Sequence, residues 1–257
     1  MKREMAPLAG CKIEVHEVGE GAPLLFLHSG QGFIPDHPYV GMLAKRRRVI
    51  APSHPGFGAS ELPDWLDTCD DIAHIYLELL DRLGLAKVDL VGCSIGGWIA
   101  AEMASKAPER LNELVLVAPV GVKTGPADKL DIPDIFAMSQ DKVNQLLFHD
   151  PARANVDLSK LSDAQLSVMA RNRETLALLV WEPWMHNPKL RHRLHRVACP
   201  VLFLRGESDG LVAADYVARY AKLVPNARVE TIPQAGHAVQ VEAPEPFAAK
   251  VLGFLDA

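Results

Sequence analysis

The chain has 257 residues, of which 49% are hydrophobic and 23% are charged, and its formal net charge at pH 7 is -5. This length suits one large domain, and the composition is ordinary for a globular protein with a core of normal size. The charge gives no electrostatic footprint for nucleic acid, and no apolar stretch approaches the length of a membrane span. The one basic run, residues 45–48, leads directly into Val49 and Ile50, so we interpret it as a solvated junction between a helix and a strand.

The N-terminal residues and the four cysteines bear on the cellular compartment. Residues 1–15 carry charges without a following apolar segment, which predicts no secretory signal. Cys11, Cys69, Cys93 and Cys199 have neither the spacing of a disulfide framework nor that of a zinc site. We therefore expect a cytoplasmic protein without a metal site. The sequence leaves both a monomer and a homodimer open.

Short apolar segments with strand character recur along the chain. Several are continuously apolar rather than alternating, which is typical of strands that are buried on both faces of a parallel sheet. The predicted strands are residues 12–18, 23–28, 48–51, 88–93, 114–118, 201–205 and 228–232.

Helical patterns separate these strands. Thr68 and Asp71 have the spacing of a capping box, and apolar residues then recur at helical intervals as far as Gly84. Strands that alternate with helices predict an α/β fold with a mostly parallel, doubly wound sheet. Further helices are predicted at residues 95–107, 213–223 and 246–255.

The alternation stops between residues 122 and 196, where no convincing strand pattern appears. Ser162 and Gln165 form a second capping-box pattern there, and a helical pattern follows it. Because this stretch is too long for an ordinary loop, we divide the chain into a core, residues 1–121 and 197–257, and a helical lid, residues 122–196. Most aromatic residues of the lid should form its own core, but some are candidates for a substrate pocket shared with the sheet. These candidates are Phe136, Met138, Trp181 and Trp184.

A serine lies at the junction between a predicted strand and a predicted helix. Residues 92–96 read Gly-Cys-Ser-Ile-Gly, and in this setting the pattern is typical of a nucleophile elbow. Glycines on either side remove side chains that would collide with neighbouring backbone, and the helix N-terminus favours developing negative charge. The sharp turn thus exposes a hydroxyl, and we expect Ser94 to be a nucleophile.

A nucleophilic serine needs a base, and the base needs a group that orients it. His237 lies in a turn-rich loop between the last predicted strand and the last predicted helix, and Asp209 follows a buried-type strand. Glu207, two residues away from Asp209, is the obvious competitor as the acid. Asp215 falls in a predicted helix and is the weaker candidate.

Four ordered motifs resemble the α/β-hydrolase superfamily, in particular its esterases, lactonases and C–C hydrolases. The resemblance extends from residue 23 to residue 255. Residues 28–32 resemble the H-G-G-x-G oxyanion loop, residues 52–60 the D-x-P-G-x-G-x-S loop, residues 206–209 the G-x-x-D motif, and residues 236–245 the G-H-x-x-x-x-E-x-P-E motif. The order serine, aspartate, histidine is also the one expected of this superfamily.

The resemblance assigns a role to each candidate. It implies that Ser94 is the nucleophile, that His237 is the general base and then the acid, and that Asp209 orients His237. The tetrahedral oxyanion needs preorganised N–H donors. We assign these to the backbone amides of Ile95 and Gly30, with Ser29 as the alternative for the second. No cofactor is implied, and the expected partner is a small-molecule substrate.

The substrate class is less constrained than the chemistry. A serine at the elbow argues against haloalkane dehalogenases and epoxide hydrolases, which use a carboxylate. Hydrolases of aromatic ring-cleavage products usually have Asn before the nucleophile and Trp after the catalytic histidine, but here these positions hold Cys93 and Ala238, while Gln240 does match. We therefore predict hydrolysis of a small carboxylic ester or lactone through an acyl-enzyme. The alternative is a C–C bond hydrolase acting on a β-diketone or ring-cleavage product, and the second alternative is a ligand receptor on a hydrolase scaffold.

Overall fold

The computed structural model describes residues 1–154 and 156–257. The described residues form one sheet of eight strands in the order β1-β2-β4-β3-β5-β6-β7-β8. The strands are β1 (Lys2–Leu8), β2 (Cys11–Val18), β3 (Pro23–Leu27), β4 (Arg48–Pro52), β5 (Val88–Cys93), β6 (Leu111–Val117), β7 (Val201–Gly206) and β8 (Ala227–Ile232).

The sheet is mostly parallel, as the sequence predicts. Only the pairs β1–β2 and β2–β4 are antiparallel, and the strands from β4 through β3 and β5 to β8 run parallel to one another. Every residue of β5 and of β7 is buried, which explains why their sequences are mostly apolar, with Asp89 and Arg205 as the charged exceptions. The sequence did not indicate β1, because this edge strand is half exposed and mixes charged with apolar residues.

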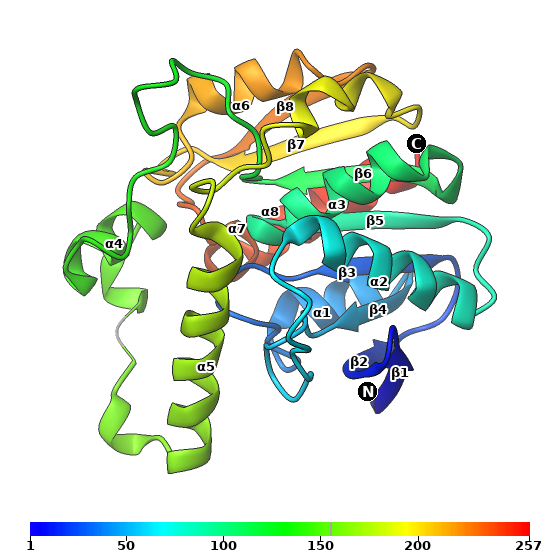
Figure 1. Ribbon diagram of the computed structural model, residues 1–257, viewed down its shortest axis with the longest axis horizontal. Helices are drawn as coiled ribbons and strands as arrows, with labels where there is room; N and C mark the ends of the chain where they lie inside the picture. The colour runs from blue at the N-terminus through cyan, green and yellow to red at the C-terminus, as the bar shows by residue number, and fades with distance from the viewer. Residues whose placement is uncertain (155) are drawn as a thin grey trace.

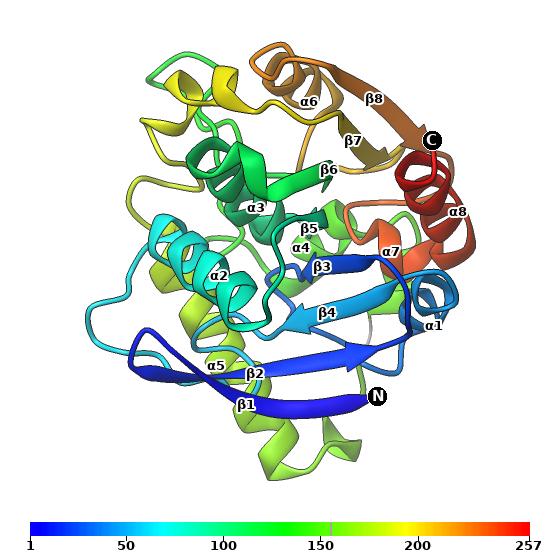
Figure 2. The same ribbon diagram turned by 90° about the vertical axis from the view of Figure 1, so that its right-hand side faces the viewer.

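Helices cover both faces of the sheet, so the prediction of a doubly wound α/β fold is confirmed (Figures 1 and 2). Each face of the sheet packs against one layer of helices, and alternate side chains of β3 point to opposite faces. Leu25 and Leu27 pack with the first core cluster, and Leu24 and Phe26 pack with the second. The helices of the first layer are α2 (Cys69–Arg82), α3 (Ile95–Lys106) and α6 (Ala214–Ala221), and those of the second are α1 (Pro38–Ala44), α7 (Val239–Glu242) and α8 (Pro244–Leu255).

The basic run lies at the predicted junction, between the end of α1 and the start of β4. The expectation of solvated side chains is wrong for Arg47, which is buried. Its guanidinium donates to the Leu255 carbonyl and to the Asp256 carboxylate, each at 2.7 Å, and to the Asp89 carboxylate at 3.3 Å. These acceptors satisfy the buried cation, so Arg47 serves the fold rather than a binding surface.

Helices and turns fill the stretch between β6 and β7, and its described residues contain no strand. The capping boxes predicted at Thr68 and at Ser162 start α2 and α5, respectively. Figure 1 shows α4 and α5 beside the edge at which the parallel strands end. The elements of this stretch are α4 (Gln140–Leu147), α5 (Asp163–Val180) and short 3-10 turns at Pro151–Ala154, Leu158–Lys160, Leu190–His192 and Leu194–Arg196; a further such turn, Pro108–Arg110, precedes β6.

The two chain segments that connect this stretch with the sheet pair with each other. Gly121 and His186 form an isolated bridge. The amide of Gly121 donates to the Met185 carbonyl, and the amide of Asn187 donates to the Gly121 carbonyl, both at 3.0 Å. The stretch therefore leaves and rejoins the sheet at neighbouring points.

Candidate active site

Ser94 occupies a sharp turn between β5 and α3. Its φ of 55° and ψ of -115° lie in a region that residues with a side chain rarely adopt. A Cβ atom at Gly92 would collide with the Gly96 carbonyl, and a Cβ atom at Gly96 would collide with the carbonyl oxygens of Leu27 and His28. The turn therefore needs glycine at both positions, as the sequence pattern predicts.

The three side chains singled out as nucleophile, base and acid lie together. The Ser94 Oγ is 2.9 Å from the His237 Nε2, and the His237 Nδ1 is 3.1 Å from the Asp209 Oδ2. The Asp209 side chain is fully buried, and its Oδ1 accepts the amides of Leu211 at 3.0 Å and Val212 at 2.8 Å. A carboxylate held in this way fixes the imidazole so that its other nitrogen faces the hydroxyl.

The competing carboxylates point elsewhere. Glu207 is exposed and accepts the Gln234 amide at 3.4 Å. Asp215 lies on α6 and pairs with Arg219 one turn later. Of the three acidic candidates, Asp209 is the one that bonds His237.

The N–H groups expected to form the oxyanion hole are available. Ile95 is the first residue of α3, so its amide has no acceptor one helical turn earlier. In the part of the chain that the structure describes, the amides of Ile95, Ser29 and Gly30 make no hydrogen bond to protein. Ser29 and Gly30 are both half-buried, so the choice between them as second donor stays open. Leu176 of α5 packs against Gly30: a Cβ atom there would lie 2.7 Å from the Leu176 Cδ2, so the leucine side chain would have to move aside.

A pair of buried histidines supports the loop that carries Ser29 and Gly30. The rings of His28 and His54 lie 3.7 Å apart. The His28 Nε2 accepts the His54 amide at 2.9 Å, so the His28 Nδ1 is the nitrogen that donates to the Ser29 carbonyl, at 2.7 Å. Burial lowers the pKa of His28 to about 4 and the pKa of His54 well below its ordinary value. His54 was not among the predicted site residues, and its only signal in the sequence is its place in the second glycine-rich motif.

Three of the four predicted pocket residues, Phe136, Trp184 and Trp181, form a chain of aromatic contacts. Phe136 and Met138 are half-buried and pack against the main core cluster. The Phe136 ring meets the Trp184 ring edge-on at 6.0 Å, and the Trp184 ring meets the Trp181 ring in the same way at 6.1 Å. The Arg173 guanidinium lies 5.2 Å from the centre of the Phe136 ring. Their contact with a substrate stays a prediction.

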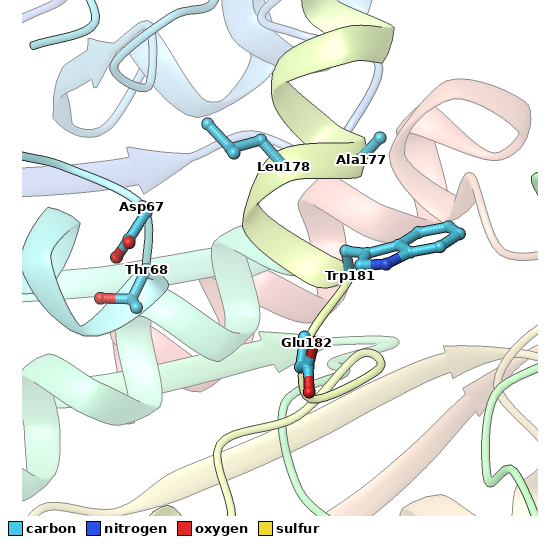
Figure 3. Close-up of a pocket in the computed structure, with 6 residues that line it drawn as sticks. All are labelled: Asp67, Thr68, Ala177, Leu178, Trp181 and Glu182. Carbon is cyan, nitrogen blue, oxygen red and sulfur yellow. The ribbon is translucent and has the colours of Figure 1, made fainter. Parts of the chain in front are cut away.

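Two surface hollows flank α5, and no side chain of the Ser94 site lines either of them. Figure 3 shows the first, a groove between the C-terminal turns of α5 and the start of α2, with a volume of about 420 Å³. Trp181, which is 60% exposed, lines this groove. The second has a volume of about 370 Å³ and is lined by Gly56, Ser60, Glu61, Leu62, Arg171, Glu174, Thr175 and Leu178.

Within residues 1–154 and 156–257, no three His, Cys, Asp or Glu side chains gather closely enough to hold a metal ion. None of the helices in these ranges combines the length and the apolar character that crossing a membrane requires.

Residues 24–250 match the family model described as "Alpha/beta hydrolase family". The chain therefore belongs to the alpha/beta hydrolase family and has the fold of a hydrolase. It is 30% identical to 2-hydroxymuconate semialdehyde hydrolase of Pseudomonas putida, over 96% of this chain and 92% of that protein. It is 29% identical to 2-hydroxy-6-oxo-2,4-heptadienoate hydrolase of Pseudomonas putida, over 98% of this chain and 96% of that protein.

Solved structures show the same fold at lower identity. A meta-cleavage product hydrolase from Pseudomonas fluorescens has a TM-score of 0.79 at 19% identity, and the match covers 98% of this chain and 97% of that chain. A bromoperoxidase from Bacillus anthracis also has a TM-score of 0.79, at 23% identity, and the match covers both chains completely, 100% of each. These two proteins share the fold but are named for different reactions, so the fold alone does not identify the reaction that this chain catalyses.

Proposed function

We propose that this chain is a serine hydrolase in which Ser94, His237 and Asp209 form a catalytic triad. The observation that carries the proposal is the continuous hydrogen-bonded chain from the Ser94 Oγ through the imidazole to the Asp209 carboxylate, with distances of 2.9 and 3.1 Å. A buried carboxylate, an imidazole and a hydroxyl on a strained turn are together the groups that acyl transfer requires.

The first chemical step follows from this geometry. His237 removes the proton of Ser94 as the Oγ attacks a substrate carbonyl carbon, and the electron pair of the C=O bond moves to its oxygen. The amide of Ile95, with that of Gly30 or Ser29, stabilises the resulting oxyanion. One such donor typically contributes about 3 kcal/mol to transition-state stabilisation.

We further propose that the bond broken is a C–C bond next to a ketone. The relatives that extend over more than nine-tenths of both chains are named for a muconate semialdehyde and for an oxo-heptadienoate. These names favour C–C hydrolysis over the ester or lactone hydrolysis expected from the sequence. Cys93 and Ala238 remain departures from the usual ring-cleavage pattern. Burial raises the pKa of the Cys93 thiol, so it packs as a small apolar group beside Ser94.

The same triad completes this reaction. In the 2-keto tautomer of a 2-hydroxy-6-oxo-dienoate, collapse of the tetrahedral intermediate breaks the C–C bond, and its electron pair is delocalised over the leaving fragment as a conjugated enolate. The His237 imidazolium supplies the proton to that fragment. Neutral His237 then activates water, which hydrolyses the acyl-enzyme and releases a carboxylic acid. One water is consumed, so atoms and charge balance.

We also propose that residues 122–196 form a lid over the site, with residues 1–121 and 197–257 as the core. The contact between Leu176 and Gly30 supports this arrangement, because it places α5 on the loop of the expected oxyanion donors. Arg173 precedes Leu176 by one helical turn and lies over Phe136. A dienoate substrate carries a carboxylate, for which this guanidinium is a suitable partner.

The experiment compares two substrates on the full chain and on Ser94→Ala. We expect kcat/KM for 2-hydroxy-6-oxo-2,4-heptadienoate to exceed that for p-nitrophenyl acetate by about 100-fold, a difference of about 3 kcal/mol in transition-state binding. Both activities should vanish in Ser94→Ala. A preference for the ester would select the second candidate function, ester hydrolysis. Turnover of neither substrate by folded protein would leave the ligand-receptor alternative.

Substitution of Arg173 separates charge recognition from the chemistry. Arg173→Met should raise KM for the dienoate by about 2- to 5-fold, since an ion pair at an exposed position such as Arg173 is typically worth about 0.2 to 1 kcal/mol. The same variant should leave KM for the neutral ester unchanged. Steady-state kinetics with both substrates checks this, and an equal effect on both would refute a carboxylate partner at Arg173.

A further inference from the structure

Glu242, the last residue of α7, is buried, with 8% of its surface exposed. Its carboxylate accepts three main-chain amides. The Oε2 accepts those of Gly236 at 2.6 Å and His149 at 3.0 Å, and the Oε1 accepts that of Asp150 at 3.1 Å. Its main-chain carbonyl accepts the Arg153 guanidinium at 2.9 Å. Hydrogen bonds to an ionised carboxylate are about twice as strong as those between neutral groups.

The three amides come from two segments that are far apart in sequence. Gly236 precedes His237 directly, whereas His149 and Asp150 follow the last turn of α4. One buried carboxylate thus joins the loop of the proposed base to the stretch between β6 and β7.

Main-chain bonds join the same parts of the molecule. The amides of His237 and Ala238 donate to the Leu147 carbonyl at 2.8 and 3.2 Å, and the amide of Gly210 donates to the Leu146 carbonyl at 3.0 Å. The last carbonyls of a helix have no intrahelical donor, so the end of α4 is free to accept these amides. The loop that carries the proposed acid and the loop that carries the proposed base are therefore both hydrogen-bonded to the C-terminal end of α4.

The approach is too close to admit a side chain at Gly236. A Cβ atom there would lie 2.6 Å from the Leu147 carbonyl oxygen and 2.8 Å from the His149 amide nitrogen. The His149 Nδ1 also lies 2.8 Å from the hydroxyl of Ser208, next to Asp209. The position of the His237 loop is thus set by backbone contact with residues 147–149.

We propose that Glu242 is a positioning residue for His237, which it holds in place by binding the Gly236 amide and the amides after α4 at once. This inference rests on the proposed function. His237 has to face Ser94 and Asp209 together, and a displacement of about 1 Å can cost about 100-fold in rate. Glutamine cannot replace Glu242, because its NH₂ group would face an amide donor in place of an acceptor oxygen. It follows that the C-terminal end of α4 is part of the structure that positions the proposed triad.

The test uses Glu242→Gln in the full chain, with p-nitrophenyl acetate as substrate and a fluorophosphonate as label for Ser94. We expect kcat and the labelling rate both to fall by about 10-fold or more, while KM stays within about 2-fold, because the carboxylate does not touch the pocket. The matched control is Glu245→Gln, an exposed residue three positions later, which should behave like wild type. If Glu242 acted on folding alone, Glu242→Gln would lower the melting temperature. Its kcat, calculated per active site that the fluorophosphonate can label, would then be unchanged.

Folded Glu242→Gln with wild-type kcat, or with a change in KM alone, would overturn the inference. If this variant does not fold, Glu242→Asp tests the same link, because the shorter side chain keeps the negative charge but cannot reach all three amides at once. It should lower kcat by about 2- to 5-fold, the effect of losing one hydrogen bond, and an unchanged kcat would then overturn the inference. Wild type without Ser94-dependent turnover or labelling would instead contradict the proposed function, and the inference with it.

Discussion

At the scale of single residues, Ser94 shows how neighbours hold an unfavourable conformation. A residue in such a region of φ and ψ typically costs about 1 to 3 kcal/mol. The Ser94 amide donates to the Val117 carbonyl at 2.8 Å, and its carbonyl accepts the amides of Gly97 at 2.9 Å and Trp98 at 3.1 Å. The turn is therefore fixed from both sides, by β6 and by the first turn of α3.

The glycines of this turn give the first prediction. Gly96→Ala should destabilise the protein by about 3 kcal/mol or more and abolish turnover, because its Cβ atom would collide with backbone that cannot move aside. Gly253→Ala is the control, since this exposed position in α8 has open space around it. It should stabilise by up to about 1 kcal/mol. Urea unfolding measures both, and wild-type stability of Gly96→Ala would contradict the geometry.

The candidate site was predictable from sequence where a residue lies in a local motif. Ser94, Asp209 and His237 each follow a strand within a short pattern, and parallel strands bring their ends to one edge of the sheet. The contacts of His54 and Glu242 could not be predicted in the same way. Their partners His28 and His149 are 26 and 93 residues away, and a place within a motif does not reveal such distant contacts.

At the scale of elements, α5 is attached to the two glycine-rich loops by side chains of a single turn. The Asn172 amide group donates to the Gln31 carbonyl at 3.3 Å, and its oxygen accepts the Gly58 amide at 3.1 Å. The Thr175 hydroxyl donates to the Gly56 carbonyl at 3.2 Å. Both side chains are buried, so these bonds are shielded from water.

Removal of this attachment should loosen α5 without disturbing the proposed triad. Asn172→Ala deletes both bonds, and each such bond is typically worth about 0.5 to 1.5 kcal/mol. We expect faster hydrogen exchange across α5 and an increase in KM of about 5- to 10-fold with a smaller change in kcat. Ser167→Ala, at an exposed position of the same helix, serves as the control. Unchanged exchange in α5 would show that the attachment lies elsewhere.

The fold was predictable where an element is long or fully buried, and less so elsewhere. The mostly apolar sequences of β5 and β7 and the capping boxes of α2 and α5 are strong local signals. By contrast, α1 and α4 have seven and eight residues. Helices this short are stable only through tertiary packing, so their sequences carry little periodicity to recognise.

At the scale of the whole molecule, His28 and His54 link the protonation state to folding. Both are buried between β3, β4 and α2, and burial keeps their folded-state pKa below the ordinary value of a histidine. Between pH 6.5 and pH 4 the unfolded chain therefore binds protons at these residues that the folded chain does not. Stability accordingly falls as pH falls through this window.

This linkage predicts a specific loss of stability in mild acid. With a folded-state pKa of about 4 for His28, acidification from pH 7 to pH 5 should cost about 2 kcal/mol at that residue. His28→Gln should lose less stability than wild type over the same interval. The comparison between the two isolates the histidine, because buried carboxyls such as Asp89 and Glu102, whose pKa values burial raises, are common to both. Urea midpoints at the two pH values measure it, and equal losses would refute the linkage.

The measurement that tests the central claim most directly is covalent labelling of wild type with a fluorophosphonate, read by peptide mass spectrometry. The account predicts a single adduct on Ser94, no adduct in Ser94→Ala, and labelling slowed by about 1,000-fold or more in Asp209→Asn, which leaves His237 without its orienting carboxylate. An adduct on another residue, or equal labelling of wild type and Asp209→Asn, would contradict the assignment of Ser94, His237 and Asp209 as a working triad.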